Sequence, residues 1–362
     1  MVTSAYIHIP FCKSKCRYCS FVSYPDLSFK ERYLKSLNEE INYYYKQEPL
    51  KTLYIGGGTP SVLKPEEIAG IVNLFSFAAN PEITVELNPE TLIPEYFKVL
   101  KNAGVNRISL GCQTFNDEIL KLIARRHNSQ QVKDVVKAAQ ECGFDNINLD
   151  FIYGLPSQSM SDFINDLNTA LTLGVSHISL YGLKIEDGCY FYSNPPENLP
   201  DEDMQADMYL KAIEILENAG FNHYEISNFA KDDYYSRHNL NYWDNAQYYG
   251  FGIAAHGYVG GVRYSNFTDF ENYFKNPLEH AIRHEVSLYE KLEEEIFLGF
   301  RRMNGLSIEC INKKFNIDFE KKYAAILEKY EKYGYLIKTQ NGYKLSNEGI
   351  LISNSILAEF LN

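Results

Sequence analysis

Strand-like and helix-like segments alternate through the first half of the sequence. The predicted strands are short, rich in Ile, Val, Leu and Tyr, and bounded by Gly, Pro or Asn. They cover residues 5–11, 52–57, 82–87, 106–112, 146–153 and 177–183, and helical patterns separate them at 30–46, 65–77, 94–103, 130–142 and 160–173. This order predicts an α/β fold in which parallel strands and right-handed crossovers form an open, partial (β/α)6 barrel.

Three cysteines, Cys12, Cys16 and Cys19, follow the first predicted strand with the spacing C-x3-C-x2-C. Three thiolates can hold three irons of a 4Fe–4S cluster, which leaves the fourth iron open to a small molecule. A structural zinc site needs a fourth protein ligand, and only His8 lies nearby, with Cys112 far along the chain. A disulfide would leave one of the three thiols over. The spacing favours the open cluster, with zinc as the alternative.

Other residues suited to ligand binding follow the next strands, and strand ends are where barrels place their sites. The glycine run at 56–60 lets the backbone approach a ligand closely, although it is also a common turn. Glu86 and Asp150 are carboxylates that can accept hydrogen bonds from ribose hydroxyls, or can be surface acids. The Arg125 guanidinium has the fork geometry that pairs with a ligand carboxylate. Arg126, the next residue, has the same group, so the sequence does not decide between the two.

The second half of the chain shows a different organisation. One long helix is predicted at 201–219, an aromatic, loop-rich stretch at 221–261 and a further helix at 288–302. The tail has the order helix, helix, hairpin, helix, with Asn341-Gly342 as the hairpin signal. We expect a barrel domain at 1–200, a helical and aromatic loop region at 201–302, and a winged-helix-like C-terminal domain at 303–362.

The aromatic stretch contains the run His238-Asn239-Leu240-Asn241-Tyr242-Trp243. An imidazole beside large aromatic rings fits a porphyrin, which needs a flat apolar surface and often a histidine ligand. The alternative is a hydrogen-bonded histidine in an aromatic loop, and the residue types by themselves favour that alternative.

Composition narrows the range of partners. The 362 residues carry a net charge of −12, which disfavours nucleic acid, because phosphate binding needs a positive surface. The seven cysteines follow no disulfide framework, and neither a secretory leader nor a membrane-spanning apolar run is recognisable. We expect a cytoplasmic protein.

Taken together, three segments of the sequence resemble a known family. They are the run from Tyr6 to Cys19 with its three cysteines, the run Gly56-Gly57-Gly58-Thr59-Pro60-Ser61, and residues 148–156 (Asn-Leu-Asp-Phe-Ile-Tyr-Gly-Leu-Pro). All three resemble radical S-adenosylmethionine (SAM) proteins related to oxygen-independent coproporphyrinogen III dehydrogenase, also called an oxidase. Two features point to the HemW branch, whose members are described as heme chaperones. The run at 238–243 matches the H-N-x-x-Y-W heme motif of that branch, and Phe21 stands where the dehydrogenases carry a fourth cysteine.

The resemblance implies roles for individual residues. Cys12, Cys16 and Cys19 would ligate the 4Fe–4S cluster. The residues implied in SAM binding are Tyr6, Tyr18, Gly57, Gly58, Thr59, Glu86, Gln113, Arg125 and Asp150, some of which match contacts to a second SAM in the dehydrogenases. The residues implied in heme contact are His238, Asn239, Tyr242 and Trp243.

The function implied is that of a heme chaperone, which binds heme and passes it to acceptor hemoproteins. Those acceptors can be membrane-bound, which would place the protein peripherally at the inner membrane face; monomer and homodimer are both open. The first alternative is radical decarboxylation of coproporphyrinogen III, or another radical reaction on a tetrapyrrole. A zinc-stabilised interaction protein is the alternative from a different class.

Overall fold

The computed structural model describes residues 1–91 and 94–361. Within that part, the main sheet has the strand order β7-β8-β6-β5-β4-β3-β2-β1-β9. The strands that follow one another from β1 to β6 all pair in parallel. These six are β1 (Ser4–Ile9), β2 (Leu50–Gly57), β3 (Phe77–Leu87), β4 (Arg107–Gln113), β5 (Asn146–Tyr153) and β6 (His177–Gly182). The predicted α/β partial barrel is confirmed.

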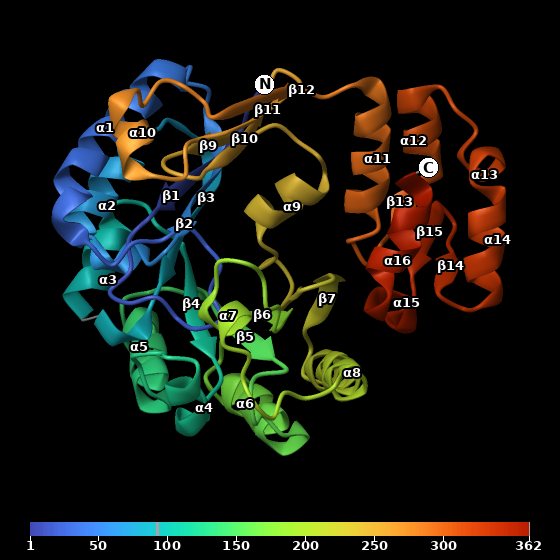
Figure 1. Cartoon of the computed structure of the whole chain (residues 1–362), viewed down its shortest axis with the longest axis horizontal. Coiled ribbons are helices and arrows are strands. Elements are labelled where there is room, and N and C mark those ends of the chain that lie inside the picture. The colour runs from blue at the N-terminus through green and yellow to red at the C-terminus, as the bar shows by residue number, and fades with distance from the viewer. Residues whose placement is uncertain (92–93, 362) are drawn as a thin grey trace.

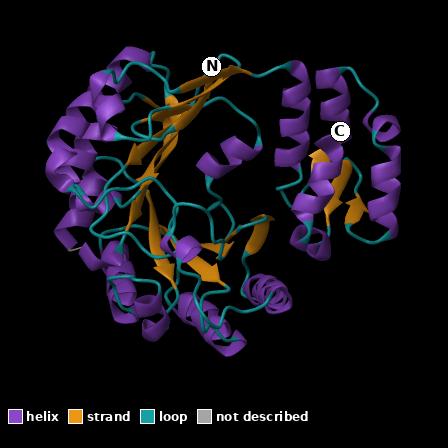
Figure 2. Ribbon diagram, in the orientation of Figure 1, coloured by secondary structure: helices purple, strands orange, loops and turns teal. Residues whose placement is uncertain are grey.

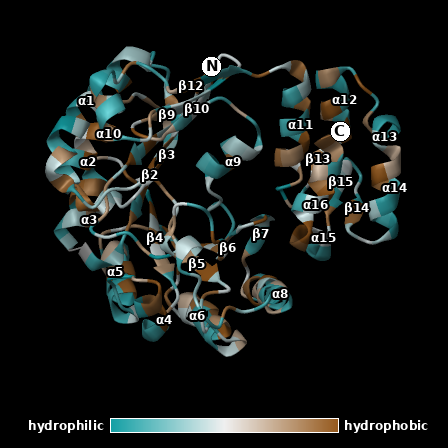
Figure 3. Cartoon of the chain, viewed as in Figure 1, coloured by the Kyte–Doolittle hydropathy of each residue, from teal (hydrophilic) through white to brown (hydrophobic). Residues whose placement is uncertain are grey.

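Helices cover the outer, convex face of the curved sheet (Figures 1 and 2). They are α1 (Lys30–Tyr44), α2 (Pro65–Val72), α3 (Pro94–Asn102), α4 (Asp117–Leu122), α5 (Ser129–Glu141), α6 (Met160–Thr172) and α8 (Glu202–Asn218). In α5 the buried side chains are Val132, Val135, Val136 and Ala139, at the spacing of one helix face. Figure 3 shows hydrophobic and hydrophilic patches side by side on these helices, as one-sided burial requires.

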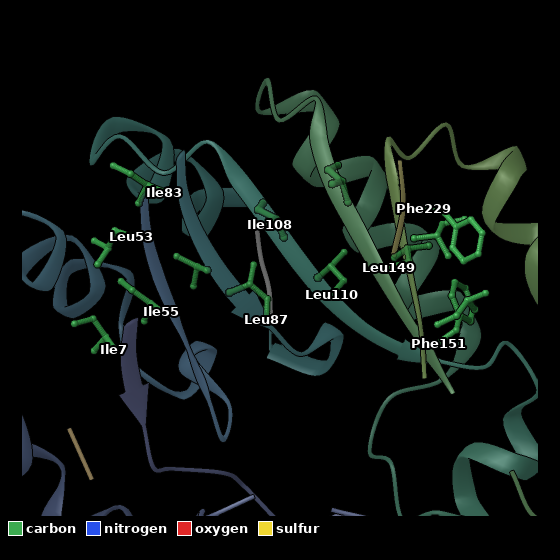
Figure 4. Close-up of a cluster of buried hydrophobic side chains, with 14 of the residues drawn as sticks. Ile7, Leu53, Ile55, Ile83, Leu87, Ile108, Leu110, Leu149, Phe151 and Phe229 are labelled. Carbon is green, nitrogen blue, oxygen red and sulfur yellow. The ribbon is translucent and has the colours of Figure 1, made fainter. Parts of the chain in front are cut away.

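The core lies where side chains from neighbouring strands meet. Figure 4 shows Ile7, Leu53, Ile55, Ile108 and Leu110, all fully buried, on β1, β2 and β4. Full burial of an aliphatic side chain of this size stabilises the fold by about 1.5–3 kcal/mol. The apolar core thus fixes the strand order and, with it, which loops meet at the C-terminal edge of the sheet.

The stretch at 221–261, expected to be rich in loops, also contains short strands and a helix between its loops. These are β7 (Asn222–Glu225), β8 (Asn228–Ala230), α9 (Arg237–Trp243), β9 (Tyr249–Phe251) and β10 (His256–Val259). β8 pairs antiparallel with β6 and with β7, and β9 pairs parallel with β1, so β7 and β9 are the two edge strands of the barrel sheet. Strands of three or four residues are too short for a clear alternating pattern, and they form here because a sheet edge supplies their hydrogen-bond partners.

One short helix lies before α8, and two strands and a helix follow β10. They are α7 (Tyr190–Ser193), β11 (Val262–Ser265), α10 (Phe270–Lys275) and β12 (Ile282–Glu285), with β10, β11 and β12 forming an antiparallel sheet. None of the helices in 1–91 and 94–361 combines the length and apolar character needed to cross a membrane.

The C-terminal part is a small antiparallel sheet flanked by helices, as predicted. It comprises α11 (Leu288–Gly299), β13 (Leu306–Ser307), α12 (Ile308–Phe315), α13 (Phe319–Lys322), α14 (Ala324–Lys332), β14 (Leu336–Lys338), β15 (Gly342–Leu345), α15 (Asn347–Leu351) and α16 (Ser353–Ala358). The hairpin predicted at Asn341-Gly342 joins β14 to β15. Figure 1 shows α9 on the concave side of the barrel, between the sheet and α11.

Candidate functional site

The three cysteines lie in a loop that follows β1 and is held by backbone hydrogen bonds from several segments. The Cys12 N–H donates to the Tyr24 carbonyl (3.0 Å), and the Arg17 N–H donates to the Ile123 carbonyl (3.1 Å). The Phe191 N–H of α7 donates to the Arg17 carbonyl (3.0 Å). The loop is therefore held at both its ends and its middle, which keeps its thiols at the C-terminal edge of the sheet.

The glycine run after β2 lies directly against the cysteine loop. The Gly58 N–H donates to the Ile9 carbonyl (2.9 Å) and the Thr59 N–H to the Phe11 carbonyl (2.7 Å). The Cys12 Sγ and the Thr59 Oγ1 are 3.3 Å apart, within hydrogen-bond distance. A Cβ added at Gly58 would lie 2.6 Å from the Phe11 carbonyl oxygen, closer than real Cβ atoms approach. Only glycine fits this position while the cysteine loop stays in place.

Replacing Gly58 by alanine is expected to lower the free energy of unfolding by about 2 kcal/mol or more, because backbone must shift to admit the methyl group. Gly70→Ala is the matched control: nothing lies within 4 Å of its added Cβ, and it sits inside α2. There alanine should raise stability by about 0.5–1 kcal/mol. Urea unfolding measures both, and equal effects would contradict the assigned contact.

The thiols are close enough to influence one another's ionisation. Burial is the largest cause of the raised pKa of Cys12, and burial also raises the pKa of Cys19 to about 11. The charge of Cys16 also raises the pKa of Cys12, and the charges of Cys16 and Cys12 also raise that of Cys19. No three His, Cys, Asp or Glu side chains in 1–91 and 94–361 are arranged to enclose one metal ion. A cubane places each thiolate on a different iron, so three neighbouring but spread thiols fit it.

Arg125 lies between the cysteine loop and the end of β4. Its Nη2 donates to the Asn88 Oδ1 (2.9 Å) and to the Gly111 carbonyl (2.7 Å), while its Nη1 lies 3.7 Å from the Cys16 Sγ. Arg126 points to the surface and lies 3.9 Å from Glu90. The structure thus brings Arg125, and not Arg126, to the cluster loop.

Two buried polar atoms here have no hydrogen-bond partner among the residues that the structure describes. They are the Arg125 Nε and the Gln113 Oε1, and Gln113 also has a left-handed φ of 65°. An unsatisfied buried donor and acceptor, together with backbone strain, are typical of a site that awaits a ligand. Tyr18 lies next to them, since its electrostatic partners are Arg125, Cys16 and Cys19, and burial raises its pKa.

The two predicted carboxylates are both brought to the concave side of the sheet. Glu86 accepts hydrogen bonds from the Tyr54 hydroxyl (2.7 Å) and the Gly57 N–H (3.1 Å). Burial raises its pKa to about 7. Asp150 accepts from Ser109 and Asn148 (2.9 Å each), and burial likewise raises its pKa.

Tyr6 completes the set implied in SAM binding. Its hydroxyl is 3.1 Å from the His8 Nδ1, and its ring stacks on Tyr54. His8 in turn packs against Gly57, whose added Cβ would lie 2.8 Å from the imidazole. Tyr6 therefore lies within β1 beside Tyr54 and Glu86, whereas Tyr18, Thr59 and Arg125 lie at the cysteine loop.

The H-N-x-x-Y-W run forms the helix α9 and not a loop. Because it is helical, the four motif residues lie on two neighbouring faces. His238 and Tyr242 are four residues apart and share a face, while Asn239 and Trp243 share the neighbouring one. The His238 ring is 1% exposed, and its Nδ1 and Nε2 lie 2.8 Å from the Thr52 and Tyr242 hydroxyls. Burial lowers the pKa of His238 to about 3. Neither imidazole nitrogen is free for heme iron in this conformation, and the role of His238 in heme contact stays a prediction.

Asn239 and Trp243 are half-buried and so remain reachable from solvent. The two faces of α9 therefore differ in what they can do. The His238–Tyr242 face docks the helix on the barrel, where His238 stacks on Tyr54 (5.1 Å between centroids). Asn239 and Trp243, on the neighbouring face, are half-buried, as Tyr242 is, so a ligand can reach the motif there.

Sequence reasoning missed three residues that position the site. Tyr54 links Glu86 to His238, through its hydroxyl on one side and its ring on the other. Glu82 accepts from the backbone N–H groups of Arg237 and His238 (2.9 Å each) at the start of α9. Arg107 is fully buried, and Glu82 is one of its electrostatic partners. The charged residues inside apolar strands were the available signal, because such charges are rarely buried without a partner.

Comparisons with known proteins agree with this geometry. The sequence matches the Radical SAM superfamily over residues 6–170 and the HemN C-terminal domain over residues 286–352. The protein described as heme chaperone HemW from Lactococcus lactis is 40% identical, over 99% of this chain and 97% of its own length. Heme chaperone HemW from Bacillus subtilis is 38% identical over 99% of both chains.

The structure resembles that of coproporphyrinogen III oxidase (HemN) from Escherichia coli, described as a radical SAM enzyme. The TM-score is 0.88 at 22% identity, and the match covers 99% of this chain and 90% of that one. At this identity the likeness shows a shared fold. The cysteine loop, the barrel and the full-length similarity together show that the chain belongs to the HemW family of the radical SAM superfamily.

Proposed function

We propose that the chain is a heme chaperone, which binds heme and transfers it to acceptor hemoproteins with the help of a 4Fe–4S cluster and SAM. The observation that carries the proposal is the division of α9, whose His238–Tyr242 face is anchored beside Glu86 while its Asn239–Trp243 face stays reachable. The full-length similarity to proteins described as heme chaperones supports it.

Cys12, Cys16 and Cys19 are the residues that would hold the cluster. Burial keeps protons on Cys12 and Cys19 at neutral pH, so cluster binding must displace them, as metal binding to thiols does. The Arg125 guanidinium beside Cys16 offsets part of the negative charge that three thiolates create. A cluster held in this way supplies one-electron chemistry and an open iron for SAM.

The residues around the cysteine loop would hold SAM by complementary groups. The backbone at Gly57 and Gly58 can lie against the ligand because no side chain intervenes. The unpartnered Gln113 Oε1 and Arg125 Nε offer an acceptor and a cationic donor, which match an amino group and a carboxylate. Glu86 and Asp150 offer acceptors for ribose hydroxyls.

SAM affinity is expected to rise about tenfold between pH 6 and pH 8 and to level off above pH 8. The ionised Glu86 carboxylate is the better acceptor for a hydroxyl, and its pKa of about 7 means that this form appears over that range. Tyr54, Asp150 and Arg107 are the titratable and charged groups that act on Glu86. Equilibrium dialysis of the anaerobic protein at each pH measures this dependence. In Glu86→Gln, SAM affinity should lose the increase with pH that ionisation of Glu86 causes. The same pH dependence in this variant as in the parent chain would contradict the role of Glu86 in SAM binding.

Heme titration of the anaerobically reconstituted chain tests the proposed function. We expect a saturable Soret band at about one heme per chain, and no conversion of coproporphyrinogen III when SAM and dithionite are supplied. Phe21, which is 68% exposed, stands where the dehydrogenases carry a fourth cysteine. Porphyrin product without stable heme binding would favour the decarboxylase instead. Zinc without iron or sulfide would favour the interaction protein.

A further inference from the structure

Unpartnered buried polar atoms gather where α9, β7 and the residues after α11 meet. They are the Trp243 Nε1, the Arg301 Nε, the Arg302 Nε, the Glu225 Oε2 and the Asn228 Oδ1. We call these five residues the junction cluster. The same signature marks Gln113 and Arg125 in the site described above, where it points to a ligand.

The junction cluster is held together by the backbone. The Ile226 N–H donates to the Arg301 carbonyl (3.0 Å), and Glu225 forms an antiparallel bridge with Arg302. The Arg301 guanidinium lies over the Trp243 ring, 4.4 Å from its centroid. These contacts join the Asn239–Trp243 face of α9 to the end of α11.

Arg301 and Arg302 have partners in the protein that do not satisfy all of their N–H donors. The Arg301 Nη2 is 3.7 Å from the Glu225 Oε2, which is too long for a hydrogen bond. Arg302 forms an ion pair with Asp244, and Glu225 accepts from Asn228. Burial raises the pKa of Glu225 to about 7, so near neutral pH it offsets only part of the Arg301 charge.

Solvent reaches this cluster from outside. The Arg301 and Arg302 side chains are 27% and 28% exposed, and Trp243 is half-buried. The unpartnered Nε atoms of the two guanidiniums and the Nε1 of the indole are themselves buried, beneath side chains that are partly exposed, so a ligand would approach them through the exposed part of the arginines. Guanidinium and indole donors match a carboxylate, which accepts several hydrogen bonds at once.

We propose that the junction cluster binds the carboxylate side chains of the tetrapyrrole, with Arg301 as the main contact and the Trp243 indole N–H as the second. The inference rests on the proposed heme binding and adds to it a named subsite. It places the acidic edge of the ligand at the end of α11 and leaves the flat ring system for the Asn239–Trp243 face of α9.

The test compares heme with heme dimethyl ester, in which both carboxylates are blocked. The full, anaerobically reconstituted chain should bind heme about tenfold more tightly than the ester, since one charge-assisted contact is lost. R301Q should reduce heme affinity by about tenfold and leave ester affinity unchanged. W243F keeps an aromatic ring but lacks the N–H. It should lower heme affinity about threefold and leave ester affinity unchanged.

Arg32→Gln is the matched control, because Arg32 also lies over an aromatic ring (Phe274, 4.3 Å) but on α1. It should bind both ligands as the parent chain does. If R301Q proves unfolded by its urea midpoint, R301K keeps the charge without the planar fork and should still lose heme affinity.

Heme affinity unchanged in both R301Q and W243F would overturn the inference while the proposed function stands. Equal weakening of heme and ester by R301Q would also overturn it, since a packing role would then explain the effect. A parent chain that binds neither ligand would overturn the proposed function and the subsite together.

Discussion

Replacing Cys16 by alanine will lower the iron bound by the anaerobically reconstituted chain by about tenfold or more. Loss of a residue that supports a metal ligand typically lowers metal affinity by about 10–100-fold, and loss of a ligand itself lowers it further. Replacing Cys12 or Cys19 by alanine should give the same result, since each thiolate would hold a separate iron of the cluster. Iron and sulfide analysis, together with the visible absorption of the cluster, measures the loss.

Cys310→Ala is the control for this experiment. Cys310 is an exposed cysteine on α12, in the C-terminal part. Its removal should change neither iron content nor absorption. Full iron retention in Cys16→Ala would contradict the assignment of the cysteine loop, as would zinc in place of iron in the parent chain.

Replacing Glu82 by glutamine will lower the free energy of unfolding by about 3 kcal/mol. Glu82 is 3% exposed, accepts both N–H groups at the start of α9 and faces the fully buried Arg107. Removing the negative charge of Glu82 leaves the buried positive charge of Arg107 without a nearby opposite charge from this residue. Such a loss is costly where water cannot enter.

Urea unfolding checks this loss, and fluorescence adds a local readout because Trp243 is the only tryptophan and lies on α9. Glu118→Gln is the control: its ion pair with Lys121 (2.7 Å) is exposed, and such pairs contribute at most about 1 kcal/mol. Similar losses in the two variants would show that Glu82 is not the anchor of α9.

The sequence predicted the barrel because short apolar strand patterns alternate in it with helical patterns, each bounded by Gly, Pro or Asn. Burial of Ile7, Leu53 and Ile108 follows directly from that pattern. Cys12, Cys16 and Cys19 were predictable because their spacing is local, and a loop after a parallel strand has a known position in such folds.

The sequence could not predict contacts that depend on pairing between distant segments. β9 forms because an unpaired edge of β1 is available, and nothing in Tyr249–Phe251 alone specifies a strand. The division of α9 was missed because the run at 238–243 was treated as a loop, in which residues four apart have no fixed relation. Tyr54, Glu82 and Arg301 acquire their partners only when β2, β3 and the end of α11 surround α9.

Heme transfer is the measurement that tests the proposed function most directly. The heme-loaded chain, with cluster and SAM, is mixed with membranes from heme-starved cells that hold apo-hemoproteins, and absorption of the acceptors is followed in time. The proposal predicts that acceptors gain heme faster from the chain than from the same concentration of free heme. Transfer no faster than spontaneous release of heme from the chain, or chemical alteration of the heme, would contradict it.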